Sequence, residues 1–209
     1  MSLKTILATA VALTLSAAAA SAAVLDFAGY ANGNEQGVAN GDNRVIGGVT
    51  IEFNATGTNA NATAAAYFDH GNAGLGVCSN WTATATVNDN ECAPRSDDNL
   101  TSGETVTLSF ASAINILAGT MFNDTDPHRP LTVLGKQLTY KINGGATQTT
   151  TFENFATLSF GGVNSITFGY GDYQYYVGQM TVVPVPLPAA GLMLLAGLGA
   201  LGAARRRRG

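Results

Sequence analysis

Apolar and polar residues alternate along several short segments of this chain. In residues 49–53 and 104–110 every second side chain is apolar, which is the pattern of a strand with one buried face. The same reading predicts strands over residues 24–28, 49–53, 104–110, 114–122, 131–142, 147–152, 155–160, 165–170 and 173–182, with a further one near 82–87. Between residues 23 and 182 no segment has the apolar period of about 3.6 residues that an amphipathic helix requires.

Glycine and asparagine separate these segments. Asn143-Gly144-Gly145, between 131–142 and 147–152, is the strongest hairpin signal in the chain, because Asn and Gly tolerate positive φ. Residues 31–48 are rich in Gly and Asn and predict turns, and residues 67–98 predict a long surface loop. Many short strands joined by such turns indicate an all-β fold, an antiparallel β-sandwich, and a jelly-roll-like arrangement is the preferred version.

The first 22 residues predict a secretory signal peptide. Lys4 supplies a positive start, residues 5–20 are largely apolar, and Ala20-Ser21-Ala22 has the small residues of a cleavage site. An uncleaved membrane anchor is the alternative.

The last 27 residues, 183–209, have three parts in a fixed order. A proline-spaced segment contains Val185-Pro186-Leu187-Pro188-Ala189, an uncharged apolar run covers residues 189–204, and four arginines follow at 205–208. The 16 apolar residues would make about 24 Å of helix, somewhat short of the roughly 30 Å hydrocarbon core. Because the run has no polar face, we expect a transmembrane helix rather than a buried core helix, with the arginines on the cytoplasmic side.

This tripartite stretch, from Val185 to Gly209, resembles the VPLPA-CTERM variant of the bacterial PEP-CTERM sorting signals. The resemblance implies that an exosortase-type membrane enzyme recognises the motif and processes the chain near it. It implies no catalytic residue, because such a protein is the substrate of sorting. The expected organisation is a signal peptide (1–22), a β-sandwich domain (23–182) and a sorting signal (183–209). The expected location is the envelope membrane or the cell surface, or the extracellular matrix after release.

The predicted domain is strongly acidic. Residues 23–182 hold five basic and fourteen acidic residues, a formal charge of −9, whereas the whole chain carries −4. A domain of this charge has no electrostatic surface for nucleic acid, so cations are the more natural partners.

The only cysteines, Cys78 and Cys92, lie in the exported part. An even count in an oxidising compartment predicts a disulfide. A zinc site is the less favoured alternative, because no histidine stands at a suitable spacing from the two thiols.

No motif of a known catalytic type is present, and we expect a protein that is not an enzyme. His70 and His128 fit no metalloprotease spacing and are expected to be solvated loop residues. A hydrolase would need a cleft that brings one of them to a carboxylate or a serine.

Two oxygen-rich clusters flank predicted strands, before residue 104 and after residue 122. Calcium prefers about six to eight oxygen ligands, and the clusters would meet if strands 104–110 and 114–122 were adjacent and antiparallel. The proposed ligands are Asp97, Asp98, Asn123, Asp124 and Asp126, with Asn99 beside them. The alternative is that these residues only build turns and caps. Beyond this calcium, no cofactor is expected.

Four tyrosines, Tyr170, Tyr173, Tyr175 and Tyr176, gather late in the chain. Core packing is their favoured role, and stacking on sugar rings is the alternative. We therefore expect an exported structural or interaction protein, with a calcium-assisted carbohydrate-binding module as the second hypothesis and an extracellular polysaccharide as its partner.

Overall fold

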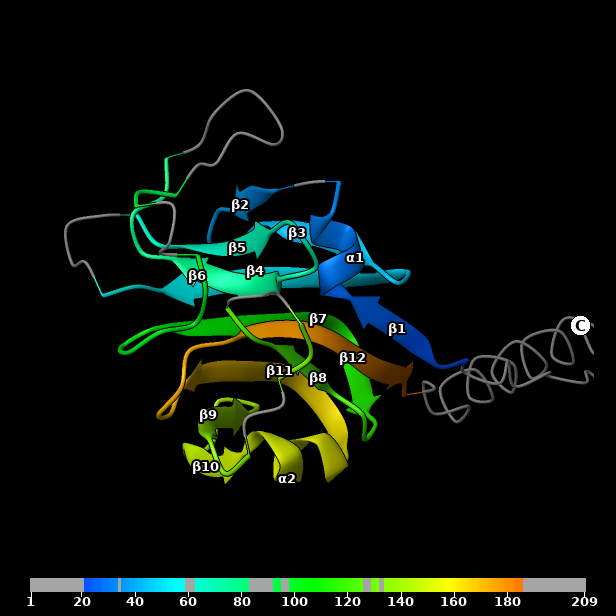
Figure 1. Ribbon diagram of the computed structural model, residues 1–209. Helices are drawn as coiled ribbons and strands as arrows, with labels where there is room; N and C mark the ends of the chain where they lie inside the picture. The colour runs from blue at the N-terminus through cyan, green and yellow to red at the C-terminus, as the bar shows by residue number, and fades with distance from the viewer. Residues whose placement is uncertain are drawn as a thin grey trace, which may run out of the picture. The chain divides into compact units, whose positions relative to one another are not determined.

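The computed structural model describes residues 21–33, 35–58, 63–82, 92–94, 98–125, 129–131 and 134–185, and most of these residues lie in antiparallel strands (Figure 1). The prediction of an all-β fold is confirmed. The signal peptide up to residue 20 and the sorting segment from Pro186 onward lie outside the described residues.

Twelve strands and two short helices make up the described part of the chain. The strands are β1 (Ala23–Asp26), β2 (Gln36–Val38), β3 (Asn43–Ile46), β4 (Val49–Thr56), β5 (Ala65–Asp69), β6 (Gly74–Cys78), β7 (Thr105–Ile116), β8 (Met121–Asn123), β9 (Gln137–Ile142), β10 (Gln148–Thr151), β11 (Phe160–Tyr170) and β12 (Tyr176–Pro184). The helices are α1 (Phe27–Ala31) and α2 (Phe152–Thr157).

The strands form one branched hydrogen-bonded network whose main path runs β10-β9-β11-β7-β12-β6-β5-β2. Strand β7 is the branch point. Over its first half it pairs with β4 on one side and with β11 on the other, and near its end it pairs with β12. In Figure 1, β7 and β12 accordingly lie between β2 on one side of the domain and β9, β10 and α2 on the other.

Aromatic rings fill the space between the branches. Phe68 of β5 packs edge to face against Phe53 of β4, with ring centroids 5.5 Å apart, and against Tyr30 of α1 at 4.8 Å. These strands belong to different branches of the network, so the ring contacts join the two branches, and the β-sandwich arrangement stays a prediction. The jelly-roll order stays a prediction.

A second aromatic group surrounds Phe122 of β8. Its ring meets those of Phe152, Phe155 and Tyr175 at centroid distances of 5.0, 5.5 and 5.5 Å. Edge-to-face contacts of this kind add to the free energy of burying the rings. They hold α2 against β8 and β12.

The predicted hairpin at Asn143-Gly144 is present. Both residues have positive φ, 52° and 67°, and they connect β9 to β10. The side chain of Asn143 also accepts hydrogen bonds from the N–H groups of Asn164 and Ser165, at 2.7 and 3.1 Å, which ties the turn to β11.

The strand predicted over residues 155–160 is wrong, because α2 occupies residues 152–157. Thr151 caps the helix by accepting a hydrogen bond from the N–H of Asn154. Phe152 and Phe155, three residues apart, lie on one face of the helix and are both buried. Because α2 has only six residues, this helical spacing does not stand out from the alternating apolar and polar residues on either side.

Residues 67–98 are not all surface loop, which corrects a second prediction. The described part contains most of β5 and all of β6, and every residue of both strands is buried. Strands buried on both faces show no alternation of apolar and polar residues, so the sequence pattern missed them. Strands β2 and β3 likewise lie within residues 31–48, where only turns were expected.

Cys78 and Cys92 form the predicted disulfide. The bond lies beside the buried ring of Tyr67, and the partly buried Trp81 packs against the same group. It therefore joins the end of β6 to the segment that leads toward β7.

We predict that the double variant Cys78→Ser and Cys92→Ser loses about 3 kcal/mol of unfolding free energy, because the bond closes a loop of roughly 15 residues. Guanidinium denaturation, followed by the fluorescence of the single tryptophan, measures the change. Wild-type protein under reducing conditions should match the variant, and equal midpoints with and without reductant would contradict the prediction.

Candidate functional site

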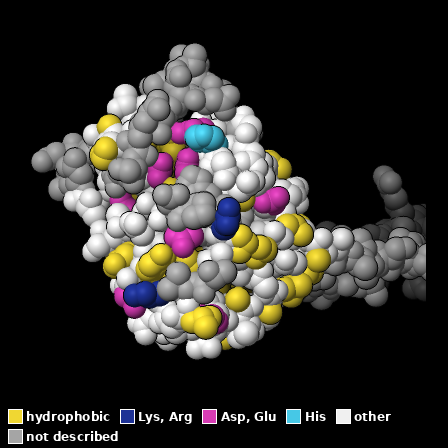
Figure 2. Space-filling model, viewed as in Figure 1, with side chains coloured by type: hydrophobic (Ala, Val, Ile, Leu, Met, Phe, Trp, Pro, Cys, Tyr) yellow, Lys and Arg dark blue, Asp and Glu magenta, His cyan; other side chains and the backbone are white. Residues whose placement is uncertain are grey.

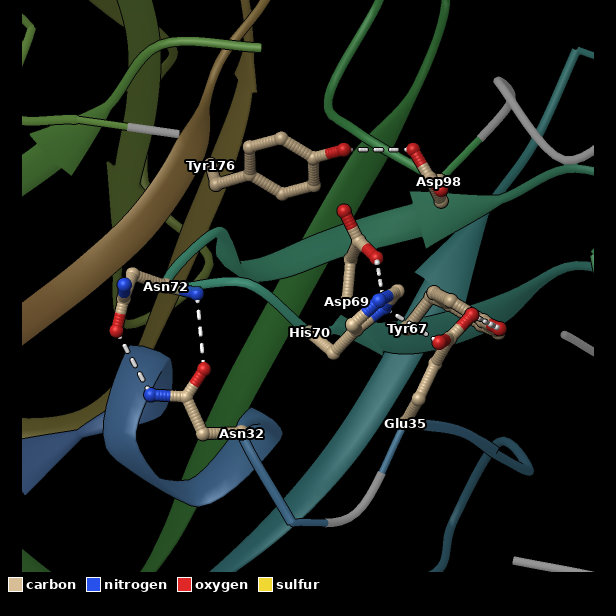
Figure 3. A network of polar contacts seen from close by, with 8 residues as sticks. All are labelled: Asn32, Glu35, Tyr67, Asp69, His70, Asn72, Asp98 and Tyr176. Carbon is tan, nitrogen blue, oxygen red and sulfur yellow. Dashed lines mark hydrogen bonds and ion pairs between the residues drawn. The ribbon is translucent and has the colours of Figure 1, made fainter. Parts of the chain in front are cut away.

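Two buried carboxylates and one histidine meet at one end of β5. The side chains of Glu35 and Asp69 are 7% and 6% exposed, whereas the imidazole of His70 is 65% exposed. His70 Nδ1 lies 2.5 Å from Glu35 Oε2 and 3.4 Å from Asp69 Oδ1. Figure 2 shows acidic side chains gathered beside the histidine on this face, and Figure 3 shows the group from close by.

Strand pairing places the two carboxylates together. Gln36 of β2 is the antiparallel partner of Phe68 in β5, so Glu35, one residue before β2, lies beside Asp69, one residue after Phe68. The hydroxyl of Tyr67 donates a hydrogen bond of 3.0 Å to Glu35 Oε1. That bond fixes the orientation of the Glu35 carboxylate and directs its other oxygen toward His70.

The turn that carries His70 is fixed by asparagines. Asn72 has a φ of 69°, and Asn32 pairs with it through two hydrogen bonds, Asn72 N–H to Asn32 Oδ1 at 2.9 Å and Asn32 Nδ2 to Asn72 Oδ1 at 2.7 Å (Figure 3). Asn123 of β8 donates to the carbonyl oxygens of Asn72 and Ala73, both at 2.8 Å. These contacts hold the β5–β6 turn between α1 and β8.

A third buried carboxylate, that of Asp98, lies beside the Tyr176 hydroxyl, as Asp69 does. The Tyr176 hydroxyl donates a hydrogen bond of 2.6 Å to Asp98 Oδ1 and also interacts with Asp69 (Figure 3). The backbone of Asp98 lies directly over β6, where a Cβ on Gly76 would come within 2.0 Å of the Asp98 carbonyl oxygen. Glycine at position 76 therefore permits this close approach.

The neutral form of Tyr176 is strongly favoured in this environment. Burial raises the pKa of its hydroxyl, and the negative charges of Asp98 and Asp69 raise it further. Burial alone raises the pKa of Tyr175, whose hydroxyl donates to the carbonyl oxygen of Gly169 at 3.0 Å. The two hydroxyls thus act as hydrogen-bond donors.

The predicted calcium ligands come together differently from the expectation. Residues 104–110 and 114–122 are not two adjacent strands, because β7 runs unbroken from Thr105 to Ile116. The two clusters approach each other through β12 instead: Leu100 bridges to Tyr175, and Asn123 pairs with Tyr176.

Each described member of those clusters already has partners within the protein. Asp98 accepts from Tyr176, Asn123 donates to two backbone carbonyls, and Asp124 lies 3.3 Å from the Tyr173 hydroxyl. The Asn99 carbonyl oxygen accepts from Val77 N–H at 3.3 Å. Asp97, Asp126 and His128 lie outside the described residues, so the calcium site stays a prediction.

Two of the four late tyrosines belong to the core, which was the favoured interpretation. Tyr175 is fully buried and Tyr176 is 2% exposed, whereas Tyr170 and Tyr173 remain partly exposed. Of the latter two, Tyr173 packs against the core and has Lys136 Nζ over its ring, 5.7 Å from the centroid.

The sequence does not predict the meeting of Glu35, Asp69 and His70. His70 lies in a turn and its imidazole is 65% exposed, as expected of a solvated loop residue, but it also contacts two carboxylates. A signal was available in Asp69-His70-Gly71-Asn72, because a Gly-Asn turn between the apolar residues 65–68 and 74–78 is typical of a hairpin. The pairing of β2 with β5, which brings in Glu35, has no comparable local signal.

Comparison with known families concerns the end of the chain. Residues 184–208 match the family model described as "PEP-CTERM protein-sorting motif". The chain carries a PEP-CTERM sorting motif. Comparison with curated proteins and with solved structures gave no match for the chain.

The PEP-CTERM motif indicates an exported, envelope-associated protein and implies an exosortase-type enzyme as its processing partner. The match begins at Pro184, the last residue of β12, whose neighbour Val183 is paired with Asn115 of β7. Among the residues that the structure describes, no helix is long and apolar enough to cross a membrane, and the apolar run 189–204 lies outside them.

We predict that alkaline unfolding begins above pH ~10, where tyrosines of the unfolded chain ionise. The raised pKa values of Tyr175 and Tyr176 mean that the folded state retains protons which the unfolded state loses. Their contribution to stability is therefore complete below pH ~10 and is lost as the pH rises beyond it. A pH titration followed by tyrosinate absorbance and far-ultraviolet circular dichroism measures both events.

At least these two tyrosines should ionise together with loss of strand structure. In Tyr176→Phe the cooperative step should lose the absorbance of one tyrosine. Ionisation of every tyrosine while the strand signal stays intact would contradict the prediction.

Proposed function

We propose that the protein is an exported structural or interaction protein, whose β domain is displayed at the cell surface or released into the extracellular matrix after sorting. The observation that carries this proposal is the PEP-CTERM motif at residues 184–208, which begins where β12 ends. The membrane helix over residues 189–204 would be a temporary anchor, held until an exosortase-type enzyme processes the chain.

We propose that the domain binds or assembles. Among the described residues His70 contacts two carboxylates, and a hydrolase of the triad type would also need a nucleophile beside its ring.

We predict that the variant Pro186→Ala plus Pro188→Ala is exported but stays unprocessed in the envelope membrane. These substitutions change the proline-spaced motif and leave Val185, whose N–H donates to the carbonyl oxygen of Ala113, in place. Cell fractionation with intact-mass measurement in the native host reports location and processing. A chain ending at Val185 is the control, because it lacks the anchor and should reach the medium. Unchanged location and mass of the proline variant would count against the proposal.

The second candidate is a calcium-assisted carbohydrate-binding module. The observation in its favour is that Tyr173, which is partly exposed, lies with its hydroxyl 3.3 Å from Oδ1 of Asp124. A partly exposed aromatic ring and a predicted calcium ligand thus lie side by side, although Lys136 Nζ lies over the Tyr173 ring, 5.7 Å from its centroid, and a sugar would have to displace it or use the other ring face. Asp126, which the calcium prediction also includes, follows two residues later in the chain.

For this candidate we predict that the full chain binds calcium and then neutral oligosaccharides, and that Tyr173→Ala weakens sugar binding while Tyr170→Ala does not. Calorimetric titration with calcium chloride, followed by the sugars, measures both steps. Absence of calcium binding, together with an unchanged melting temperature in calcium, would eliminate the candidate.

A further inference from the structure

We propose that Glu35, Asp69 and His70 form a binding site for a divalent transition-metal ion of the Zn²⁺ class. The inference stands apart from the proposed function, because it concerns residues that neither sorting nor sugar binding uses. It also differs from the predicted calcium site, since none of its three residues was among those ligands.

The spacing of the donor atoms fits a metal ion. One ligand atom from each residue can be chosen so that all three lie within 4.8 Å of one another. His70 Nδ1 and Asp69 Oδ1 are 3.4 Å apart, close to the roughly 3.3 Å between ligands held at ~2.0–2.1 Å in a tetrahedral zinc site. Glu35 Oε2, at 2.5 Å from Nδ1, occupies a hydrogen-bonding position. It would have to move by roughly 1 Å to share an ion with the imidazole.

The donor set selects the class of ion. A cluster of carboxylates alone would suit calcium or magnesium, but the imidazole nitrogen favours zinc and its neighbours in the first transition series. Three protein ligands leave one tetrahedral position for water or for a group from a partner. Because the imidazole is 65% exposed while the carboxylates are buried, the ion would be approached from the side of His70.

The charges of the site are also those that a cation requires. Glu35 is 6% exposed, and its contacts in the protein are the Tyr67 hydroxyl and His70. Burying a carboxylate is costly unless positive charge or hydrogen bonds compensate it. Among the described residues, His70 is the basic side chain in contact with Glu35, and a bound cation would supply positive charge to both buried carboxylates.

The Glu35 carboxylate is already oriented for binding a metal ion. Tyr67 is fully buried and donates to Glu35 Oε1, which leaves Oε2 as the oxygen that faces His70. Hydrogen bonds of this kind orient the ligands of protein metal sites and strengthen their affinity. Hydrogen bonds with Asn32 and Asn123 hold the β5–β6 turn that carries His70. The turn therefore needs little further ordering when an ion binds.

The test is titration of the chelator-treated full chain, purified in detergent, with zinc chloride in a calorimeter. We expect one ion per chain, and a thermal midpoint that rises with zinc concentration because zinc binds the folded state.

Two variants locate the site. His70→Ala removes an exposed side chain and Glu35→Gln keeps the size of its residue, and each should weaken zinc binding at least about tenfold. Glu52→Gln, on β4, is the matched control and should bind as the wild type does. Circular dichroism confirms that each variant is folded.

Three results would overturn the proposal: no zinc binding by the wild type, equal zinc affinity in His70→Ala, or calcium binding at this site as tight as that of zinc. The first would mean that His70 and Glu35 form only a hydrogen-bonded pair. The second would place the ion elsewhere, and the third would indicate a site made of oxygen ligands alone.

Discussion

The pairing of β7 with three other strands holds the two faces of the domain together. Residues 105–110 of this strand are bonded to β4 and residues 105–109 to β11, and residues 114–116 are bonded to β12. Between these parts β7 leaves its register with β11, because Ser109 faces Ser165 while Ile114 faces Val163. One long strand thus belongs to both branches. Phe53 and Phe68 pack together in one aromatic group, and Phe122 packs against Tyr175 in a second. Without this shared strand the two branches would have no continuous backbone connection through hydrogen bonds.

The positions of the buried carboxylates Asp69 and Asp98 depend on the pairing of β7 with its neighbour β12. Strand β12 pairs with β8 near its start and with β7 near its end, and Val177 also pairs with β6. The first residues of β12 therefore lie between β8 and β6, which are far apart in sequence. Tyr176 thereby reaches Asp98 and Asp69, and Asn123 reaches the β5–β6 turn. Each carboxylate is held by a donor from another strand. The polar network is therefore a product of the whole sheet, and His70, Asn32 and Asn72 are its exposed members.

The sequence predicted the features that have a strong local cause. Asn143-Gly144 needs positive φ and gave the hairpin, and alternation located the strand core around residues 106–110. The PEP-CTERM motif was readable because proline spacing, an apolar run and arginines follow one another directly. The failures have equally definite causes. Strands β5 and β6 are buried on both faces and show no alternation, and α2 is too short for its period to stand out. Glu35 and Asp69 meet only through pairing of β2 with β5, which depends on long-range packing and leaves no pattern in either segment.

We propose that residues from about 23 to the end of β12 form an exported β domain and that the two ends of the chain are sorting signals. The most direct test is the intact mass of the protein recovered from the envelope or the medium of its native host. The account predicts a product lighter than the 21.4 kDa full chain, lacking the first 22 residues, ending within or near residues 184–208, and gaining two hydrogens on reduction of the Cys78–Cys92 bond. A full-length chain with both ends intact and free thiols would contradict it.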